Sequence, residues 1–455
     1  MHRHRMPIKL AEPRRQWWLM KRRFSEAWRY SHSLRHGHGH ALWAKSRLAG
    51  SPAERLNQLC LAYSKLGAGP ARESISAELE PWIDGPQSRI WREQQVGRER
   101  HASAIKALGH GFVSRTVMVK APGDNGEKGV LITYFEYNFQ RLLDGIPDYR
   151  EFTSKYSVIY STSWSPTSYH LLGNLLAEST GPVFIQACNY GEIPALHGFH
   201  SRVRCLETLP CDWLQPAFYQ PRPYAERDID LLVVSNWAPF KRHWALFNAL
   251  RELPENLRVV CVGQPETGHT IEKMRAQQRL LGARQNIEFV ESIPIEEVTA
   301  LQCRARVCAI FSRREGCCVA ATESLMAGAA LALVGGACIG PLAYVNDQTG
   351  FVLDDRNLAA GLRQALAEAH DRQPREYAMS RLSCDVSARK LNELLKQEAV
   401  KEGRPWTRDI HTPCWRPYPQ LVEASAKAEL FPAFRELQQR YPAVFPEHLM
   451  DTSHR

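Results

Sequence analysis

Two glutamates in the second half of the chain have the residue types and surroundings of a ligand-binding site. Glu315 and Glu323 lie in the segment SRREGCCVAATESLMAG at residues 312–328, which continues the apolar run VCAIFS at 307–312. The pattern predicts a buried strand, a turn at Glu315 and a helix that contains Glu323. Eight residues at the helical rise cover roughly 12 Å, about the reach from a sugar to a ribose across a diphosphate.

The predicted start of that helix also suits a phosphate. The first backbone N–H groups of a helix have no partner within it, so those of Cys317 and Cys318 are available to a diphosphate. Gly316 has no side chain and allows close approach to its backbone. The alternative interpretation is that both glutamates are ordinary surface carboxylates, which are also favoured near a helix start.

A basic motif follows an earlier apolar run. The segment SNWAPFKRH at 235–243 comes after DLLVVS at 230–235 and places Lys241 and Arg242 at the head of the next predicted helix. Cations at this place can meet a phosphate. A solvated surface pair is the alternative, but a matching acidic segment in the same predicted sheet favours the phosphate for Lys241.

The elements that must position these residues alternate strictly between short apolar runs and helix-compatible segments. This alternation predicts a doubly wound parallel sheet, whose ligands bind at the carboxyl ends of the strands. Lys241 and Glu315 each follow a predicted strand, so they belong to the same edge. The predicted strands are 230–235, 257–263, 287–292, 307–312, 331–336 and 350–353, and the helices lie near 243–252, 270–282, 295–304, 318–328 and 357–370.

The stretch from about residue 230 to 370 resembles the nucleotide-binding domain of the group 1, family-four retaining glycosyltransferases. The resemblance rests on SNWAPFK after a strand, on the segment from Glu315 to Glu323, on the Gly-Gly pair at 335–336 and on NDQTGFVL at 346–353. It implies an α/β chain of the GT-B type, in which two Rossmann-like, doubly wound parallel-sheet domains face a cleft. Helical N- and C-terminal extensions complete the predicted architecture.

The resemblance also assigns roles. It implies that Glu315 contacts the donor sugar, that Glu323 holds the ribose of a nucleotide-sugar donor and that Lys241 stabilises the leaving diphosphate. It further implies retention of the anomeric configuration with no metal and no other cofactor. The predicted donor site is completed by Arg242, Gly316, Cys317, Cys318 and Asn236.

This sequence departs from the family at two places. The family often has an arginine five residues before its lysine, where this chain has Asn236, so either Arg242 substitutes or the diphosphate site is weaker. The family's glycine-rich turn in the first domain is absent, so acceptor residues cannot be transferred. His197 and His200 are the acceptor-side candidates, and plain structural roles are the favoured alternative for both.

The first half of the chain is harder to divide. The runs GVLITYF at 129–135, YSVIYST at 156–162 and PVFIQAC at 182–188 read as buried parallel strands. We therefore expect four regions: a basic helical extension at 1–112, an acceptor-side Rossmann-like domain at 113–222, a nucleotide-sugar-binding domain at 223–372 and a helical segment at 373–455 that packs back across the domains.

Charge is concentrated at the N-terminus. The first 50 residues hold 12 Lys and Arg against two acids, Glu12 and Glu26, a surplus equal to the net charge of +10 of the whole chain. A nucleic-acid enzyme would carry such charge along its working cleft, so no nucleic-acid partner is expected. Twelve cysteines without a C-x-x-C motif indicate neither a zinc module nor a disulfide framework and favour a reducing, cytoplasmic location.

The N-terminal segment also has an aromatic stripe. Trp17, Met20, Phe24 and Trp28 recur at helical spacing, with Lys21, Arg22 and Arg23 among them. The favoured interpretation is a helix that packs this stripe on the body of the protein; the alternatives are an interfacial helix on anionic lipid, at the cytoplasmic face of a membrane, and a transit peptide. The tract from His36 to His40 reads as a flexible linker rather than a metal site.

Several functions stay open at this stage. Asp228-Ile-Asp230 precedes a strand, at the wrong end of the sheet for a metal site. The primary hypothesis is a transferase with a nucleotide-sugar donor and a glycan, glycolipid or small-molecule acceptor. The alternatives are an epimerase or phosphorylase on the same fold, and a non-catalytic sugar- or lipid-binding scaffold with a decayed site, which Asn236 keeps open.

Overall fold

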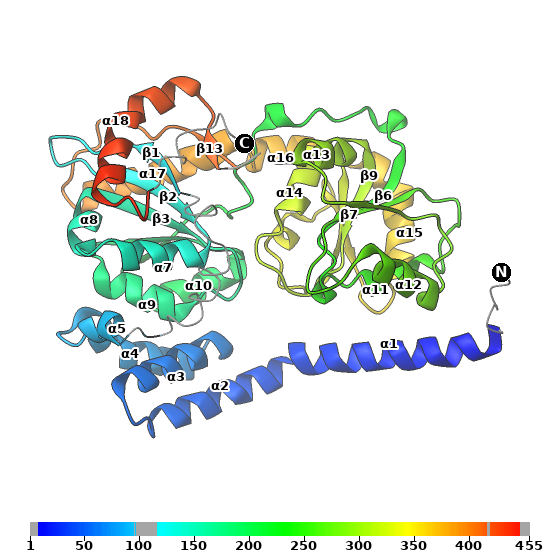
Figure 1. Ribbon diagram of the computed structural model, residues 1–455, viewed down its shortest axis with the longest axis horizontal. Helices are drawn as coiled ribbons and strands as arrows, with labels where there is room; N and C mark the ends of the chain where they lie inside the picture. The colour runs from blue at the N-terminus through cyan, green and yellow to red at the C-terminus, as the bar shows by residue number, and fades with distance from the viewer. Residues whose placement is uncertain (1–7, 95, 97–115, 416–418, 446–455) are drawn as a thin grey trace.

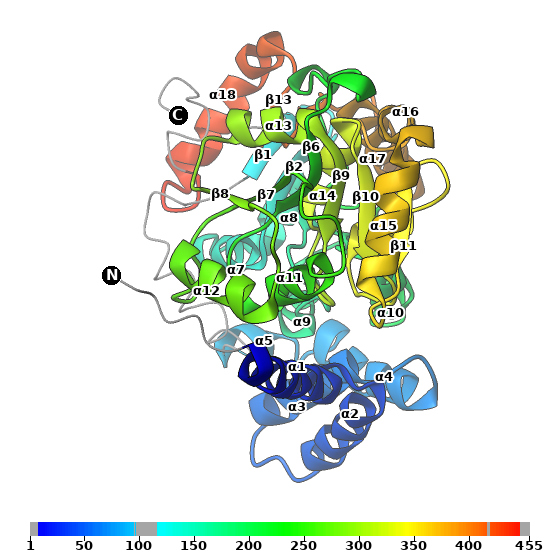
Figure 2. The ribbon, with the colours of Figure 1, turned by 90° about the vertical axis from the view of Figure 1, so that its right-hand side faces the viewer.

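The computed structural model describes residues 8–94, 96, 116–415 and 419–445. Its two α/β halves lie side by side, each built around its own sheet, with a layer of N-terminal helices along one edge of both (Figures 1 and 2). The predicted class, two α/β domains with helical N- and C-terminal extensions, is confirmed, but only the C-terminal sheet is doubly wound and wholly parallel; that prediction was wrong for the N-terminal sheet. The predicted boundary between residues 112 and 113 lies outside the described residues.

The sheet of the C-terminal half has the doubly wound order β11-β10-β9-β6-β7-β8, and every pairing in it is parallel. The chain runs outward from β6 through β7 to β8, then returns to lay β9 against the other side of β6. The gap between β6 and β9 is therefore the point at which the winding reverses. The strands are β6 (Ile229–Val234), β7 (Val259–Gly263), β8 (Glu288–Glu291), β9 (Ala305–Ile310), β10 (Ala330–Val334) and β11 (Gly350–Leu353).

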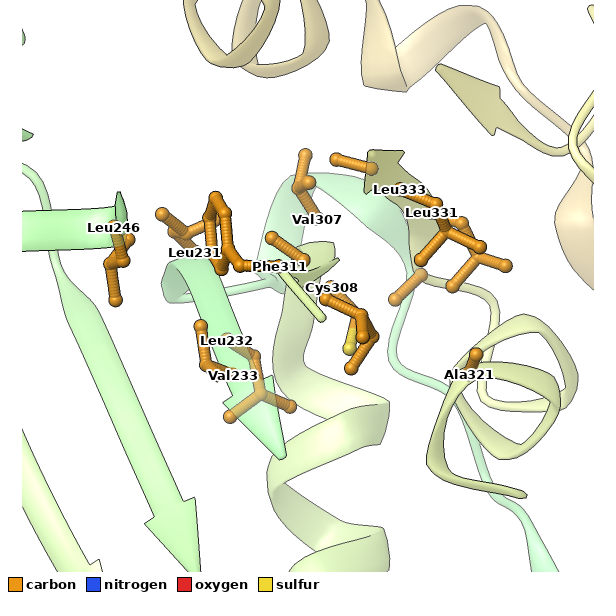
Figure 3. Close-up of a cluster of buried hydrophobic side chains, with 14 of the residues drawn as sticks. Leu231, Leu232, Val233, Leu246, Val307, Cys308, Phe311, Ala321, Leu331 and Leu333 are labelled. Carbon is orange, nitrogen blue, oxygen red and sulfur yellow. The ribbon is translucent and has the colours of Figure 1, made fainter. Parts of the chain in front are cut away.

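All six predicted strands of this half are confirmed to within about two residues, and so are its five helices. The central strands are apolar on both faces because helices cover both faces: every residue of β10 is buried, and Leu231, Val307 and Leu331 meet in one core (Figure 3). Burying one such side chain contributes about 1.5–3 kcal/mol. The covering helices are α11 (His243–Leu250), α12 (Ile271–Leu281), α13 (Ile295–Arg304), α14 (Val319–Met326) and α15 (Leu358–Glu368).

The N-terminal sheet has a different order. Its five strands follow one another as β1-β2-β3-β4-β5, with β1 antiparallel to β2 and the other pairs parallel. The three predicted strands correspond to β2 (Gly129–Tyr134), β3 (Tyr156–Ser161) and β4 (Val183–Gln186), whereas β1 (Thr116–Lys120) and β5 (Val203–Cys205) at the two edges were not predicted. The intervening helices are α7 (Glu136–Gly145), α8 (Tyr149–Lys155), α9 (Tyr169–Glu178) and α10 (Ile193–His197).

The C-terminal segment returns to this first half. Helix α16 (Pro374–Arg381) stays with the C-terminal core through Ala378, but α17 (Cys384–Lys401) and α18 (Ala424–Arg440) bury Leu391, Leu395, Leu430 and Phe434 in the N-terminal core. In Figure 1 they cover the side of the sheet opposite α7 and α9. The chain thus crosses between its two halves twice. The short strands β12 (Pro413–Cys414) and β13 (Gln420–Leu421) pair in the connection.

The N-terminal extension is helical throughout its described part. Helices α1 (Ile8–Tyr30), α2 (His32–Ser46), α3 (Pro52–Lys65), α4 (Pro70–Asp84) and α5 (Arg89–Glu93) follow one another, and α3 and α4 bury Leu56, Leu59 and Ile75 in the N-terminal core. The tract from His36 to His40 forms part of α2, so its interpretation as a flexible linker was wrong. Gly39 is tolerated in this helix because it packs directly on Leu66.

Helix α1 turns its aromatic stripe away from the protein. Trp17, Met20, Phe24 and Trp28 are 57%, 62%, 72% and 67% exposed. The opposite face packs on the C-terminal half: Leu19 is buried in that core, and the Arg15 guanidinium donates to Asn248 Oδ1 over 2.7 Å. The prediction that the stripe packs on the body of the protein was therefore wrong, because neighbouring residues on the other face make that contact.

Candidate functional site

Lys241 and Glu315 meet at the point where the winding of the C-terminal sheet reverses. Lys241 ends the short helix η5 (Pro239–Lys241) after β6, and Glu315 lies in the segment after β9, the strand that pairs with β6. The Lys241 Nζ atom lies 2.8 Å from Glu315 Oε2, with the side chains 15% and 5% exposed. Ligands of doubly wound sheets bind outside the carboxyl ends of the strands at this switch point. The structure thus brings the two strongest candidates together.

Neighbouring side chains contact both members of the Lys241–Glu315 pair. Ser312 Oγ donates a short hydrogen bond to Glu315 Oε1, so both carboxylate oxygens are engaged. Behind Lys241, burial and the nearby lysine charge lower the pKa of His243 to about 3, and its Nε2 lies 3.1 Å from Ser235 Oγ. His243 is therefore neutral at physiological pH and adds no positive charge beside Lys241.

The turn between Glu315 and α14 presents free donors. Cys318 adopts a left-handed conformation with φ of 46° and the helix begins at Val319. Within the described residues, no hydrogen bond satisfies the backbone N–H groups of Gly316, Cys317 and Cys318. Three unsatisfied amides before a helix N-terminus favour an anion. Three such amides therefore lie beside Lys241 and Glu315, and their binding of a diphosphate stays a prediction.

Gly316 has a role that its sequence position did not reveal. A side-chain carbon there would collide with the carbonyl oxygen of Ser163, which belongs to the N-terminal half. The same contact places Cys317 Sγ 2.9 Å from Cys188 Sγ, at the end of the N-terminal sheet. The glycine therefore permits the two halves to meet backbone to backbone at the candidate site.

Glu323 lies inside α14 and is only 1% exposed. The side chain is therefore enclosed by the protein in this state. In this state no ribose can reach it. Its predicted role requires that the groups covering Glu323 move when a donor binds.

Arg242 does not join the Lys241–Glu315 pair. Its buried guanidinium donates to Glu26 Oε1 over 2.9 Å, to Asp355 Oδ1 over 2.8 Å and to the Phe311 carbonyl oxygen over 2.9 Å. This residue fastens α1 to the C-terminal half. Asn236 accepts a hydrogen bond from the Ala238 N–H group over 3.3 Å and thereby shapes the turn that leads to Lys241. The charge missing at Asn236 is not supplied by Arg242 in this arrangement.

The sequence analysis missed two buried carboxylates of the N-terminal half that lie beside the candidate site. Glu136, directly after the positive-φ residue Phe135, accepts from the N–H group of Ser163 over 2.9 Å and from its hydroxyl. Glu192 accepts from Ser165 Oγ over 2.9 Å and from the Thr167 N–H group, and burial raises its pKa. Together they fix the loop at 163–167, hereafter the acceptor-side loop, against the segment that contains Glu315.

The outer part of this loop presents an aromatic side chain. Trp164 is partly exposed, and its ring lies edge-on to Phe240, with centroids 5.8 Å apart. Lys241 Nζ lies 5.1 Å from the centre of the same Phe240 ring. Trp164 is thus the exposed aromatic group of the N-terminal half that stands beside the candidate site.

The remaining candidates lie elsewhere. His197 is exposed at the end of α10, and His200 is buried with its Nε2 3.1 Å from Asp84 Oδ2 in α4. Burial lowers the pKa of both imidazoles. Asp228 and Asp230 pair with arginines at the start of β6, the opposite edge from Lys241. Across the described part of the chain, no group of three or more His, Cys, Asp and Glu side chains is arranged to hold a metal ion.

Comparison with known proteins agrees with this geometry. Residues 217–381 match the model of the family described as glycosyl transferases group 1. A search of curated proteins finds no match. Among similar solved structures is a sucrose-phosphate synthase from Thermosynechococcus elongatus, with 16% identity, a TM-score of 0.45 and coverage of 60% of this chain and 74% of that one.

Two other solved structures resemble the chain at a similar level. HepE from Anabaena, in complex with UDP, shows 13% identity, a TM-score of 0.47 and coverage of 58% and 78%. WaaG, a glycosyltransferase involved in lipopolysaccharide biosynthesis, shows 18% identity, a TM-score of 0.38 and coverage of 52% and 68%. The matched family segment contains Lys241, Glu315 and Glu323. Residues 217–381 thus match the model of the group 1 glycosyl transferases, and the structural likeness extends over both α/β halves only in part.

Proposed function

We propose that this chain is a retaining glycosyltransferase that moves a sugar from a nucleoside-diphosphate sugar to an acceptor bound on the side of the N-terminal half. The observation that carries the proposal is the Lys241–Glu315 pair at the sheet's switch point, directly before the three free amides of residues 316–318. A cation and aligned amides suit a diphosphate, and a carboxylate suits the hydroxyl groups of a sugar.

The proposed chemistry follows from where charge develops. As the glycosidic bond breaks, positive charge grows on the sugar ring and negative charge on the leaving diphosphate. Lys241 and the amides before α14 are already oriented toward that negative charge, so they stabilise it without reorganisation. Glu315 holds the sugar, and its present ion pair with Lys241 fixes both side chains before the donor arrives. Closure of the acceptor-side loop on Gly316 keeps water from the donor.

The proposed mechanism needs neither metal nor cofactor, because Lys241 and the backbone amides before α14 supply the positive potential. A thermal-shift panel of nucleoside diphosphates and their sugar conjugates tests donor binding, since a ligand that binds only the folded chain raises its melting temperature. The anomeric configuration of the product, followed by NMR in the presence of EDTA, tests retention and metal independence. Inversion or a loss of activity with EDTA would contradict the corresponding part of the proposal.

The second candidate is a non-catalytic scaffold that retains the fold. It is favoured by one observation: Asn236 leaves a charge missing at the diphosphate, and Arg242 is engaged with Glu26 and Asp355. Donor hydrolysis without acceptor separates the two candidates. A transferase slowly releases free sugar from its bound donor, whereas a decayed site binds the nucleotide and releases none.

We also propose that the chain works at a membrane surface, bound through the exposed face of α1 on the cytoplasmic side. No helix in the described part of the chain combines the length and apolar character that crossing a membrane requires. The exposed aromatic face of α1 carries Lys21 stacked over Trp17 at 5.1 Å, with further arginines beside it. Aromatic groups flanked by basic residues are typical of helices that lie in an anionic interface.

The membrane proposal is tested by co-sedimentation with vesicles. Replacing both Trp17 and Phe24 by Ser should abolish binding to phosphatidylglycerol-containing vesicles, and binding of the unaltered chain should weaken as salt screens its charges. The matched control is Phe431→Ser, which removes an aromatic group of comparable exposure from α18. Equal binding by the three proteins would refute the proposal.

A further inference from the structure

A cationic pocket lies where the N-terminal helices meet both halves of the molecule. Its volume is about 410 Å³, and its walls come from the junction of α1 and α2, the end of α3, the acceptor-side loop and the segment before Glu315. Four of its lining residues are cations, and among the lining residues that the structure describes none is an aspartate or glutamate. The cations are Arg29, Arg35, Lys65 and Arg314.

Two of these cations are held in place by carbonyl oxygens alone. Arg314 Nε donates to the Ser165 carbonyl oxygen over 2.9 Å, and Arg35 Nη2 donates to the Ser64 carbonyl oxygen. Throughout the described ranges, neither guanidinium forms an ion pair with a carboxylate. Burial and, next, the positive charge of Arg314 lower the pKa of Arg35. The carboxylate whose charge reaches Arg35, Glu192, is already bound by the acceptor-side loop.

A second pocket shows that arginines in this molecule are not generally left without carboxylates nearby. The space between α1 and the ends of β10 and β11 has a volume of about 590 Å³ and is also lined by several arginines. Glu26, Asp354 and Asp355 line it as well, and Arg242 is paired with two of them. There carboxylates stand among the arginines, and both Arg242 and Arg313 form ion pairs with them. In the cationic pocket, Arg35 and Arg314 have no carboxylate partner among the described residues, so an anion from outside would remove the repulsion between these arginines.

We propose that the cationic pocket binds a phosphate group of the acceptor. Guanidinium groups bind phosphate through paired hydrogen bonds, and a volume of this size accommodates a small ligand. The place also fits, because Arg314 directly precedes Glu315 and Pro166 belongs to the acceptor-side loop. The identification of the ligand as an acceptor rests on the proposed transferase function. The proposal that the pocket binds an anion does not depend on that function.

The rim of the pocket relates it to the surface helix. Trp28, the last residue of the exposed stripe of α1, lines the pocket beside Arg29. A phosphate that carries an apolar chain would therefore find the cations and the aromatic stripe on one continuous surface. The shared chemistry is a phosphate ester, supplied either by a lipid headgroup or by a water-soluble phosphorylated molecule.

The proposal is tested by calorimetry with inorganic pyrophosphate, with the donor site first saturated by the nucleoside diphosphate that the thermal-shift panel selects. One equivalent should bind. Arg314→Gln and Arg35→Gln should each weaken it about tenfold or more, because each removes a hydrogen bond between charged groups. Arg313→Gln is the matched control: this neighbour faces Asp355 and not the pocket, so affinity should be kept. No binding, or equal affinity in all variants, would overturn the proposal.

Two further measurements distinguish failure of the proposed function from failure of the anion site and identify the source of the phosphate. If no nucleoside diphosphate binds, yet Arg314→Gln weakens pyrophosphate binding and Lys241→Ala does not, the proposed function fails and this site stands. The source of the phosphate is read from vesicles of phosphatidylcholine with or without phosphatidic acid. Weaker binding of Arg314→Gln to the acidic vesicles alone identifies a headgroup, and competition of glycerol phosphate with pyrophosphate identifies a water-soluble ligand. If neither effect occurs, the pocket is not an acceptor-phosphate site.

Discussion

The two sheets of this molecule hold the residues at the candidate site in place in different ways. In the C-terminal sheet, the reversal between β6 and β9 brings Lys241 and Glu315 to one edge through topology alone. The described strands of the N-terminal sheet follow one another without such a reversal, and its site-facing loop is held by side chains, chiefly Glu136 and Glu192. The proposed donor side is therefore built into the winding of the chain, whereas the proposed acceptor side depends on individual buried carboxylates.

The largest loss of turnover should follow a substitution in the C-terminal half. Glu315→Gln keeps the size of the side chain but removes the charge that pairs with Lys241 and that, in the proposed function, binds the sugar. We expect turnover to fall by about 10²–10³, the usual consequence of losing one preorganised group, while the affinity for nucleoside diphosphate persists. Steady-state kinetics beside calorimetry measures both. Near-unchanged turnover would remove Glu315 from the site.

The corresponding change on the N-terminal side is Glu136→Ala. It leaves the Ser163 and Trp164 N–H groups without their acceptor and frees the loop that rests on Gly316. A shift of about 1 Å in a positioning element can cost about 10² in rate. We expect transfer to the acceptor to fall by this order while donor affinity stays. A variant that loses donor affinity instead would show that the two sides are not separable as described.

Glu323→Ala tests whether the buried second glutamate belongs to the donor side. If it binds the ribose, donor and free nucleotide should both lose about 1.5–3 kcal/mol, because both contain that group. Calorimetric titration with each ligand gives the two values. The structural alternative, support of β9 from within α14, would lower the melting temperature and leave nucleotide affinity as it was.

A prediction on stability instead of activity concerns the connection between the two halves. Burial raises the pKa of Asp212 from 3.8 to about 7, although it accepts hydrogen bonds from the Tyr344 hydroxyl of the other half. Because the folded chain holds this proton more tightly, the contribution of Asp212 to stability should be greatest below pH 4. This contribution should fall as pH rises toward 7 and stay level above.

Asp212→Asn removes this titration. Chemical unfolding between pH 4 and 8 should show a flatter dependence in the variant than in the unaltered chain, with the difference confined to the range below about pH 7. An identical slope in the two proteins would mean that Asp212 is ionised in the folded state.

The same contrast explains what could be predicted from the sequence. The C-terminal strands, the helices between them and the place of Lys241 and Glu315 follow from local apolar runs and from the rule that ligands meet strand ends. Glu136 and Glu192 gave no such signal, because their partners at 163–167 lie 25 to 28 residues away and are joined only by folding. The edge strands β1 and β5 lacked the long apolar run by which the central strands were found.

The N-terminal helices show a further limit of pattern reading. Periodicity correctly indicated a helix at residues 17–28, but it could not decide which face would be buried. Leu19 and Trp18 face the protein, whereas the larger aromatic stripe faces outward. Likewise Arg242 and Lys241 are neighbours with equal charge, yet one joins α1 to the domain and the other meets Glu315. Their different directions follow from the left-handed backbone at Arg242.

Lys241 provides the most direct test of the account. If it stabilises the leaving diphosphate, Lys241→Ala should lower kcat by about 10²–10³ and weaken donor binding by much less, because its charge matters most as the bond breaks. Arg242→Ala is the neighbouring control: it should lower the melting temperature by releasing α1 and change kcat and donor affinity by the same small factor. Equal small changes of kcat and donor affinity in Lys241→Ala, or a larger catalytic loss in Arg242→Ala, would contradict the account.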